Sequence, residues 1–381
     1  MKKIFKKLII LGILIVFFII LNIIKSIPSW ASFYSFNIAS FFIMISGSIS
    51  SLIPFSIYEL FLLVAISYIM YFIIILIRKL IKKEFFKVLE KTLTFIIVIT
   101  LSLNWYLASA SISYNRDQLP IMQYQGEVSD ALINDTIEYF IDDYNSISKT
   151  FARDKDGFIQ SPYTLEETID IIKEEYKRLD PNYFPSYTPD VKLLISSAIF
   201  SELHFTGVFF APFGEINLNS QMHAIEIPYV TAHEIAHAKG VTREDDANLV
   251  SLYINLTSSN PYLRYSAYYW SFLSLLDIYN LTNKELYYHY INKLDPAIIT
   301  EINGVYKFWN ERNILDKFGD FFNNVFLKVN GNENVTDDYN DTSTSEDTGK
   351  TDENDNPIYE ITEYSPYQKL YFAYYLSLKE N

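Results

Sequence analysis

The stretch T-A-H-E-I-A-H-A-K-G-V-T-R-E-D-D-A-N, residues 231–248, decides how the rest of the chain is interpreted. Inside it, His233, Glu234 and His237 form the pattern H-E-x-x-H. Residues four positions apart lie one turn apart on one face of a helix, so both imidazoles can reach a single tetrahedral zinc ion (Zn²⁺). Glu234 follows His233 directly and can exchange a proton with a water molecule without binding the metal itself. The alternative is an ordinary helix with two solvated histidines.

A catalytic zinc site needs a third protein ligand and leaves its fourth position open. The spacing H-E-x-x-H-x-x-G-x-x-H, used by one large group of zinc proteases, places Arg243 at that position, and an arginine cannot bind the metal. Glu244 comes next and opens a second predicted helix, whose polar stripe continues through Asn248 and Ser251. We expect Glu244 to be the third ligand, with Asp246 as the alternative. Acidic residues are also favoured at a helix N-terminus that binds no metal.

The first 112 residues differ sharply in composition from the rest. They hold eleven Lys and Arg against three Glu, whereas the remainder holds 20 basic and 42 acidic residues. Three uncharged apolar runs, 8–24, 60–77 and 93–110, have the length that roughly 30 Å of hydrocarbon requires. Residues 1–112 are therefore predicted to form a membrane domain with three transmembrane helices. The acidic remainder is not built to bind nucleic acid.

The distribution of basic residues predicts the orientation in the membrane. Between the first two runs the only charged residues are Lys25 and Glu59. By the positive-inside rule, the N-terminus and the loop between the second and third runs are cytoplasmic, and everything after about Ser111 is extracytoplasmic. The apolar segment 37–53 is interpreted as an interfacial or re-entrant helix, although a fourth span there would invert the topology. The basic residues of the second loop are Arg78, Lys79, Lys82, Lys83, Lys87 and Lys91.

Residues 113–330 are predicted to form a mainly helical domain. Thr164 and Glu167 have the spacing of a capping box at the start of a helix. Between 207 and 219 the period changes to two, which predicts a half-buried strand with Glu215 and Asn217 on its polar face. In zinc peptidases, an edge strand beside the active-site helix pairs with the substrate backbone. The alternative is a plain edge strand.

Three further features concern the rest of the chain. The aromatic stretch 262–270 is typical of a core, and Arg264, Tyr265 and Tyr268 are also candidates to donate a hydrogen bond to an oxyanion. Residues 331–356 hold nine acidic residues and one lysine, which predicts an acidic disordered linker. Residues 357–381 are predicted to contain a C-terminal helix that docks back on the domain. The absence of cysteine excludes disulfides and cysteine-based zinc sites.

With these residues in view, the chain resembles the bacterial membrane proteins of domain-of-unknown-function family 3810. H-E-I-A-H-A-K-G-V-T-R-E-D-D-A-N is similar to the family signature H-E-x-A-H-x-x-G-x-x-x-E-x-E-A-N, with Asp246 where the family has Glu. Residues 212–219, P-F-G-E-I-N-L-N, are similar to the family's P-F-x-G-E-x-N-x-N but one residue shorter. The resemblance implies three membrane spans followed by a zincin-like domain of the gluzincin type, and it singles out Glu215.

We therefore expect an α-helical membrane protein whose three transmembrane helices precede a mainly α, α+β zincin-like extracytoplasmic domain with a small sheet. The expected function is that of a metallopeptidase in the bacterial cell envelope, with the lipid bilayer and a peptide or protein substrate as partners. His233, His237 and Glu244 would hold zinc, and Glu234 would activate water. The alternative is a non-catalytic envelope module with a structural zinc ion or no metal. The presence of Glu234 favours the enzyme.

Overall fold

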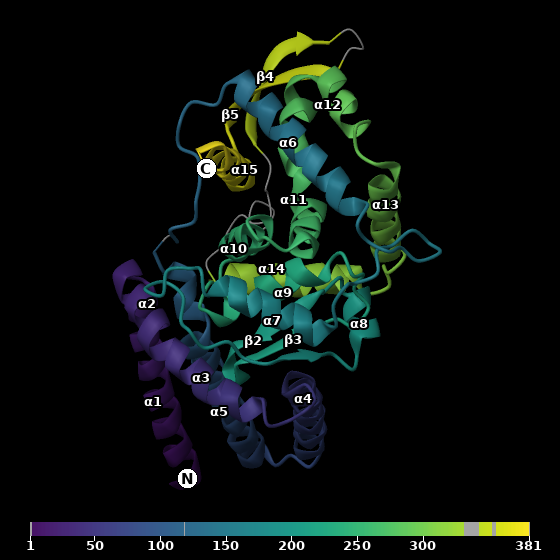
Figure 1. The fold of residues 1–381 in the computed structure, drawn as a ribbon. Helices are drawn as coiled ribbons and strands as arrows, with labels where there is room; N and C mark the ends of the chain where they lie inside the picture. Colours follow the sequence, from purple (N-terminus) through teal and green to yellow (C-terminus); the bar gives the residue numbers. More distant parts are fainter. Residues whose placement is uncertain (1, 118, 331–342, 353–355, 381) are drawn as a thin grey trace.

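The N-terminal part of the chain forms a group of apolar helices beneath a larger, mostly helical domain (Figure 1). The computed structural model describes residues 2–117, 119–330, 343–352 and 356–380. Most of the large apolar side chains of the N-terminal helices are exposed, so these helices present an apolar surface to their surroundings. They are α1 (Lys2–Lys25), α2 (Pro28–Tyr34), the π-helical turn η1 (Ser35–Ala39), α3 (Ser40–Ser50), α4 (Ile57–Ile81) and α5 (Phe85–Ser109).

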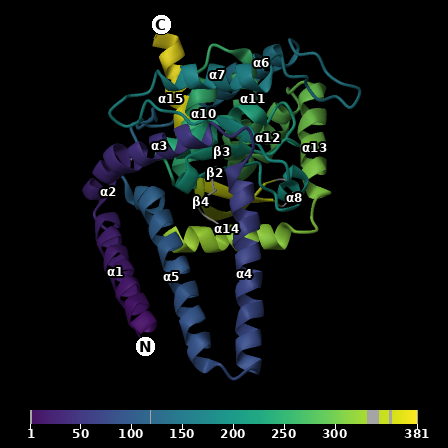
Figure 2. The ribbon, with the colours of Figure 1, turned by 90° about the horizontal axis from the view of Figure 1, so that it is seen from below.

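Three helical stretches are long and apolar enough to cross a membrane: Lys2–Lys25, Pro28–Ser50 and Ile57–Ile81. The first and the last contain the predicted spans 8–24 and 60–77. The third predicted span, 93–110, overlaps α5, which is not one of these three stretches and packs along both α1 and α4 (Figure 2). The stretch Pro28–Ser50, which includes most of the predicted interfacial segment, runs across α1 and α5 at their domain-side ends (Figure 2). These apolar helices indicate an association with a membrane.

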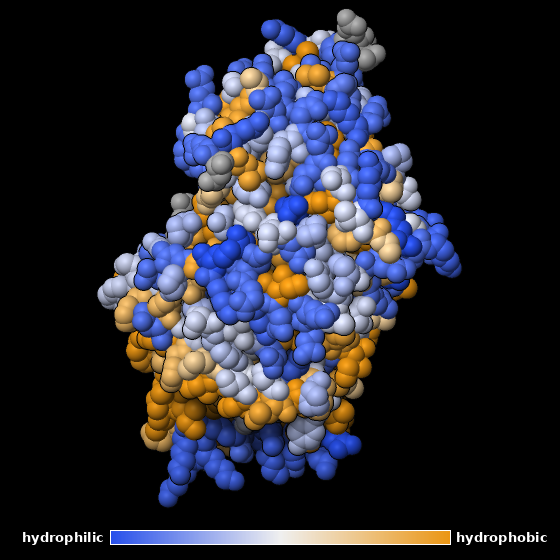
Figure 3. Space-filling model, in the orientation of Figure 1, coloured by the Kyte–Doolittle hydropathy of each residue, from blue (hydrophilic) through white to orange (hydrophobic). Residues whose placement is uncertain are grey.

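The two basic segments of the N-terminal region lie at the same end of the helix group. Lys7 near the chain start donates hydrogen bonds to the side chains of Glu90 (3.3 Å) and Thr94 (2.7 Å), at the start of α5. Figure 3 shows an apolar band across the lower part of the molecule, with polar residues beneath it. The larger domain lies at the opposite end of these helices (Figure 2).

Helix α11 (Pro261–Thr282) is the element around which the larger domain packs. Its aromatic stretch is core, as predicted, because Tyr262, Tyr265, Tyr268 and Phe272 are almost completely buried. The predicted capping box is confirmed at the start of α7. The remaining helices are η2 (Ser111–Asn115), α6 (Asp130–Ser148), α7 (Leu165–Tyr176), α8 (Ser197–Glu202), η3 (Ala211–Phe213), α9 (Ile227–Ala238), α10 (Glu244–Leu256), α12 (Lys284–Ile291), α13 (Pro296–Asn310), α14 (Asp316–Asn330) and α15 (Pro366–Glu380).

A small sheet packs against α9, and its strand order corrects one prediction. The strands β1 (Val191–Leu193), β2 (Gly207–Phe210) and β3 (Glu215–Leu218) are arranged in the order β1-β3-β2. β3 is parallel to β1 and antiparallel to β2. The predicted half-buried strand is therefore the fully buried centre of the sheet, and β2 is the edge strand next to it.

The polar residues of β3 are buried because the N-terminal helices cover them. The carboxylate of Glu215 has no exposed surface and accepts a hydrogen bond from the Lys192 ammonium at 2.6 Å. It also accepts the backbone N–H groups of Ile57 and Tyr58, each at 3.1 Å, at the first turn of α4. The alternation of polar residues thus marks a buried contact between the sheet and α4. A two-residue period predicts which side chains share a face of a strand, but it does not predict what covers that face.

The C-terminal region also differs from the prediction. Residues 344–351 form strand β4 (Thr344–Thr351), which pairs antiparallel with β5 (Pro357–Glu363) inside the region predicted as linker and helix. Residues 331–342 and 353–355 of the predicted linker lie outside the described residues. β5 packs on α11, and β4, which lies in the acidic segment, pairs with β5. The composition of the acidic segment does not predict this pairing. The final helix α15 docks on α6 and α11, as predicted, and buries Tyr367, Leu370, Tyr371 and Phe372.

Candidate metal centre

Helix α9 carries the H-E-x-x-H residues and packs against β2, β3, α10 and α11. Ala232, Ile235 and Ala236 are completely buried, and the two alanines let neighbouring elements approach the helix closely. His233 and His237 lie on the same side of α9, with ring centroids 4.5 Å apart and planes almost perpendicular. The helix therefore presents two imidazoles to one point in space, as the spacing predicts.

A tight turn after α9 returns the chain toward the two histidines. Gly240 has a φ angle of +83°, a left-handed conformation that favours glycine at a helix C-terminus. The backbone N–H groups of Gly240 and Val241 donate to the carbonyls of His237 and Ala236, each at 3.0 Å, which closes the end of the helix. Helix α10 then begins at Glu244 and points this side chain back at α9.

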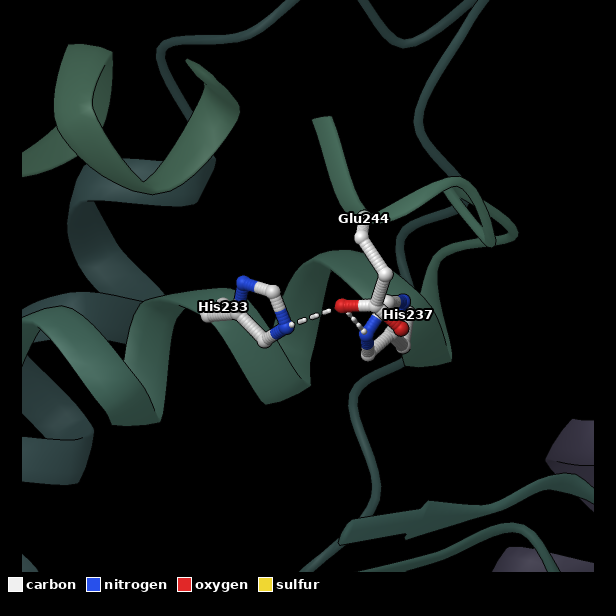
Figure 4. Close-up of side chains that lie close together, drawn as sticks. All are labelled: His233, His237 and Glu244. Atoms are coloured by element: carbon white, nitrogen blue, oxygen red, sulfur yellow. Dashed lines mark ion pairs between the residues drawn. The ribbon is translucent and has the colours of Figure 1, made fainter. Parts of the chain in front are cut away.

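Glu244 meets both histidines, as the sequence predicts (Figure 4). Its Oε2 atom lies 3.2 Å from Nε2 of His233 and 3.6 Å from Nε2 of His237. One ligand atom from each of these residues lies within 4.8 Å of the other two. The alternative ligand, Asp246, points elsewhere: its Oδ2 atom lies 3.6 Å from Nε of Arg243.

The charges of the cluster are strongly coupled. Burial works to raise the pKa of Glu244, but the two histidines outweigh burial and hold the pKa well below the usual range of a glutamate. Burial works to lower the pKa of His237, but the Glu244 carboxylate outweighs this effect and raises it to about 9. Without a metal, the cluster is therefore an ion pair. A metal ion would displace the proton of His237, because only neutral imidazole binds metal.

The donor set fits a zinc ion. Two imidazole nitrogens and one carboxylate oxygen form the protein ligands of many catalytic zinc sites, in which the fourth position is open. Nδ1 of His237 lies 2.7 Å from the Val241 carbonyl oxygen, which accepts its hydrogen and leaves Nε2 directed at Glu244. The three side chains are 13–14% exposed, so a small ion can reach them from solvent.

Glu234 stands beside the cluster and lies against the edge strand β2. It is 4% exposed, and the backbone of Phe209 on β2 favours the charged form of its carboxylate. Its Oε2 atom has no hydrogen-bond partner among the described residues. Burial raises the pKa of Glu234, as expected for a carboxylate that gives and takes a proton.

Gly207 and Phe209 are functional candidates that the sequence interpretation missed. A Cβ atom added to Gly207 would lie only 2.6 Å from Oε1 of Glu234, so the glycine makes room for that carboxylate. A glycine inside a strand often marks such a close approach, and this signal was available in the sequence. The effect of Phe209 on the pKa of Glu234 comes from its backbone, so its side chain gives no signal.

The structure does not bring the predicted substrate-contacting residues to the cluster. The Tyr265 hydroxyl donates to Glu301 at 2.8 Å, and the Tyr268 hydroxyl donates to Asp143 at 2.6 Å. Glu215 binds Lys192 and the start of α4, and Asn217 is buried on the same strand. The structure places these four residues in the core, where tertiary packing uses their polar atoms or covers them, and a role for them in substrate binding stays a prediction.

The turn that follows α9 is also held by the segment next to the apolar helices. Arg116 donates hydrogen bonds to the carbonyls of Gly240 (3.1 Å) and Tyr183 (2.9 Å). Gly240 lies close to the hydroxyl of Ser35, where an added Cβ would approach to 2.7 Å. The cluster is therefore fixed directly against the N-terminal helix group.

These features define a class of protein in which an apolar helical N-terminal region supports a mostly helical domain with a His–His–Glu cluster. The model of the family described as Protein of unknown function (DUF3810) matches residues 34–343, and the chain belongs to this family. The resemblance seen in the sequence is thus confirmed at the level of the family. Comparisons with curated proteins and with solved structures give no match.

Proposed function

We propose that the chain is a membrane-anchored zinc-dependent hydrolase, and specifically a metallopeptidase that acts on peptides or proteins outside the cytoplasm. One observation carries the proposal. Three metal-binding side chains converge, while a fourth carboxylate, that of Glu234, lies beside them with one oxygen unbonded among the described residues. A zinc site that serves stability alone has no use for a buried acid–base group at this position.

Each residue has a distinct role in this proposal. His233, His237 and Glu244 would hold the ion. A bound zinc ion lowers the pKa of a water molecule and polarises a carbonyl group. Glu234 accepts a proton at Oε2 and delivers it to the leaving amine, while the backbone of Phe209 favours the charged form of the carboxylate. Gly207 keeps the space that this carboxylate occupies.

The edge strand β2 supports a peptide as the substrate. β2 pairs with β3 on one side, and no strand among the described residues pairs with its other side. It also carries Gly207 and Phe209, both of which lie against Glu234. An extended peptide that adds to such an edge forms backbone hydrogen bonds along the strand and lies beside the acid–base group.

The placement in the membrane is a second part of the proposal. α1, α4 and α5 cross the bilayer, since α5 packs along both of the others. The stretch Pro28–Ser50 runs across them and lies in the membrane surface. The basic segments at the far end of these helices are cytoplasmic by the positive-inside rule. The larger domain, and with it the cluster, then faces outward.

One observation favours a competing function. Glu244 lies close to both histidines, so a non-catalytic envelope module could use this ion pair, or a structural zinc ion held by the same residues, to join α9 to α10. The position of Glu234 argues against this alternative. Only the hydrolase requires the carboxylate at this site to change its protonation state.

Zinc content tests the proposal. The full-length chain purified in detergent is expected to hold about one zinc ion, as a mononuclear site of this kind does. His237→Ala should lose it, and His289→Ala should retain it, because His289 is an exposed histidine on α12. An equal zinc content in the wild type and in His237→Ala would contradict the proposal.

Topology is tested separately. A reporter enzyme that is active only in the cytoplasm, fused after Ser111, should be silent. The same reporter fused within the loop after α4 at Lys83 should be active. Activity at Ser111 would place the domain in the cytoplasm and would require Pro28–Ser50 to be a span.

A further inference from the structure

In Figure 2, helix α14 is seen in projection across α4 and α5, near the ends of these helices that face the larger domain, and in Figure 1 it lies above α4. Its start is held close to the loop that precedes β2. A Cβ atom added to Gly319 would lie 2.3 Å from the carbonyl oxygen of Leu203, so only a glycine allows this contact. This contact fixes which side of α14 faces the domain.

The end of α14 is tied to the ends of α1 and α5. The side-chain N–H of Asn330 donates to the Tyr106 hydroxyl at 2.6 Å, and its side-chain oxygen accepts from Ser111 at 2.7 Å. Its backbone carbonyl accepts from the ammonium of Lys25 at 3.2 Å. Tyr106 is in the last turn of α5, and Lys25 is the last residue of α1. α14 is therefore held at the depth at which these apolar helices end.

The other side of α14 is apolar and exposed. Phe318 is 59% exposed and Val325 is 43% exposed, and Ile314, just before the helix, is 78% exposed. Phe318 and Val325 are seven residues apart, two turns along α14, which places them on one face that Phe321 (59% exposed) shares. Gly319, which meets Leu203, lies toward the other side of the helix, so the apolar face is directed away from this contact with the domain.

The charged residues of α14 are placed as expected for a helix at a lipid surface. Lys317 and Lys328 are exposed and lie beside the apolar face on the helix surface. Asp316 and Asp320 lie on the side opposite to it. Lysines at the border of an apolar helix face reach lipid phosphates while their stems remain near the hydrocarbon.

We propose that α14 is a membrane-surface helix that inserts Phe318 and Val325 of its apolar face into the headgroup region of the bilayer, next to the ends of α1 and α5. The occupant is lipid, because the end of α14 is fixed at the ends of these apolar helices and its exposed face is apolar, as their exposed surfaces are. The inference rests on the proposed membrane placement and is independent of hydrolase activity. Together with Pro28–Ser50, α14 would hold the metal centre at a fixed height above the bilayer.

The chain has no cysteine, so single labels can be introduced without background. Phe318→Cys and Val325→Cys would each carry a polarity-sensitive fluorophore in the full-length chain. The vesicles would contain phosphatidylethanolamine and phosphatidylglycerol, with spin-labelled lipid whose quencher lies either near the headgroup or deep in the acyl chain. Asp320→Cys is the matched control on the other side of α14. Met70→Cys, 59% exposed in the middle of α4, is the control for deep lipid contact.

The labels at 318 and 325 are expected to lose roughly half of their fluorescence to the shallow quencher, as for an interfacial helix, while the label at 320 loses little. The label at 70 should respond most to the deep quencher. If 70 responds and 318 and 325 behave like 320, the membrane placement holds and the docking of α14 is wrong. If 318 and 325 are shielded from lipid and from aqueous iodide, protein covers this face. If 70 does not respond, the membrane placement fails, and the inference fails with it.

Discussion

Nε2 of His233 and Oε2 of Glu244 lie 3.2 Å apart although the residues are eleven positions apart in the sequence. The left-handed Gly240 ends α9 and allows α10 to begin where its first side chain faces the histidines. This relationship makes Glu244, and not the neighbouring acids, the third member of the cluster.

Glu244→Gln is expected to lose zinc, whereas Asp246→Asn should keep it. Changes to residues that only hydrogen-bond a metal ligand already weaken metal binding about 10–100-fold, so the loss of a ligand itself should exceed that range. Asp246 lies next to Arg243 and is outside the cluster, which makes it a matched acidic control. Competition against a chelator measures both affinities. The opposite ranking would make Asp246 the ligand.

As the pH rises toward about 9, the stability of the metal-free chain should fall while its affinity for zinc should rise. The pKa of His237 is raised to about 9 in the folded metal-free chain. Its charged form therefore stabilises this form fully below the unfolded pKa of about 6.5, and this stability is lost as the pH rises through about 9. Zinc binding requires the neutral ring, so affinity should rise up to about tenfold per pH unit toward pH 9.

Two titrations check these signs. Denaturant unfolding of the metal-free chain should show decreasing stability between about pH 6.5 and 9. Chelator competition over the same range should show increasing zinc affinity. Affinity that does not depend on pH would mean that His237 carries no proton in the metal-free state.

Gly207→Ala should impair hydrolysis while zinc remains bound. The new Cβ would overlap Oε1 of Glu234, so either the carboxylate or β2 must move, and overpacking of this kind costs about 1–3 kcal/mol of stability. Activity on a library of quenched fluorescent peptides should fall at least about tenfold if the carboxylate is the group that moves. Gly12→Ala is the control, because a Cβ at Gly12 meets open space. Equal activity of the two variants would show that the space at Gly207 is not needed.

The sequence predicted the His–His–Glu cluster better than its surroundings, for physical reasons. The helical period brings His233 and His237 together, and one short turn at Gly240 brings Glu244 to them. Gly207 meets Glu234 through a packing of strand on helix that no local pattern encodes. The hydroxyls of Tyr265 and Tyr268 bind Glu301 and Asp143, far away in the chain.

In the membrane region and the C-terminal region, too, local composition predicted less than the packing of the chain determines. Hydropathy is summed over a whole segment, so the apolar helices were found, but the crosswise course of Pro28–Ser50 depends on packing. The acidic composition of 331–356 predicted no structure, yet Thr344–Thr351 pairs with Pro357–Glu363 because backbone hydrogen bonds do not depend on side-chain charge.

Glu215→Gln should destabilise the chain without affecting zinc binding directly. Breaking a buried ion pair leaves an uncompensated charge, here on Lys192, and costs about 3–5 kcal/mol. Thermal unfolding in detergent should therefore shift to lower temperature, while the folded fraction retains its zinc. Glu174→Gln, which removes an exposed lysine pair, should leave the unfolding temperature unchanged. A loss of activity in Glu215→Gln at full stability would support the predicted role of Glu215 in substrate binding.

Glu234→Gln tests the central claim most directly, because it separates metal binding from proton transfer. The variant keeps the shape of the side chain, and His233, His237 and Glu244 are unchanged, so the zinc content of the full-length chain should equal that of the wild type. Hydrolysis of any peptide that the wild type accepts should fall by about 10²–10⁴-fold, the usual contribution of a general acid–base group. Zinc content and peptide hydrolysis would be measured on the same preparations. Full zinc content with lost activity is the predicted result, and full activity, or joint loss of zinc and activity, would contradict the account.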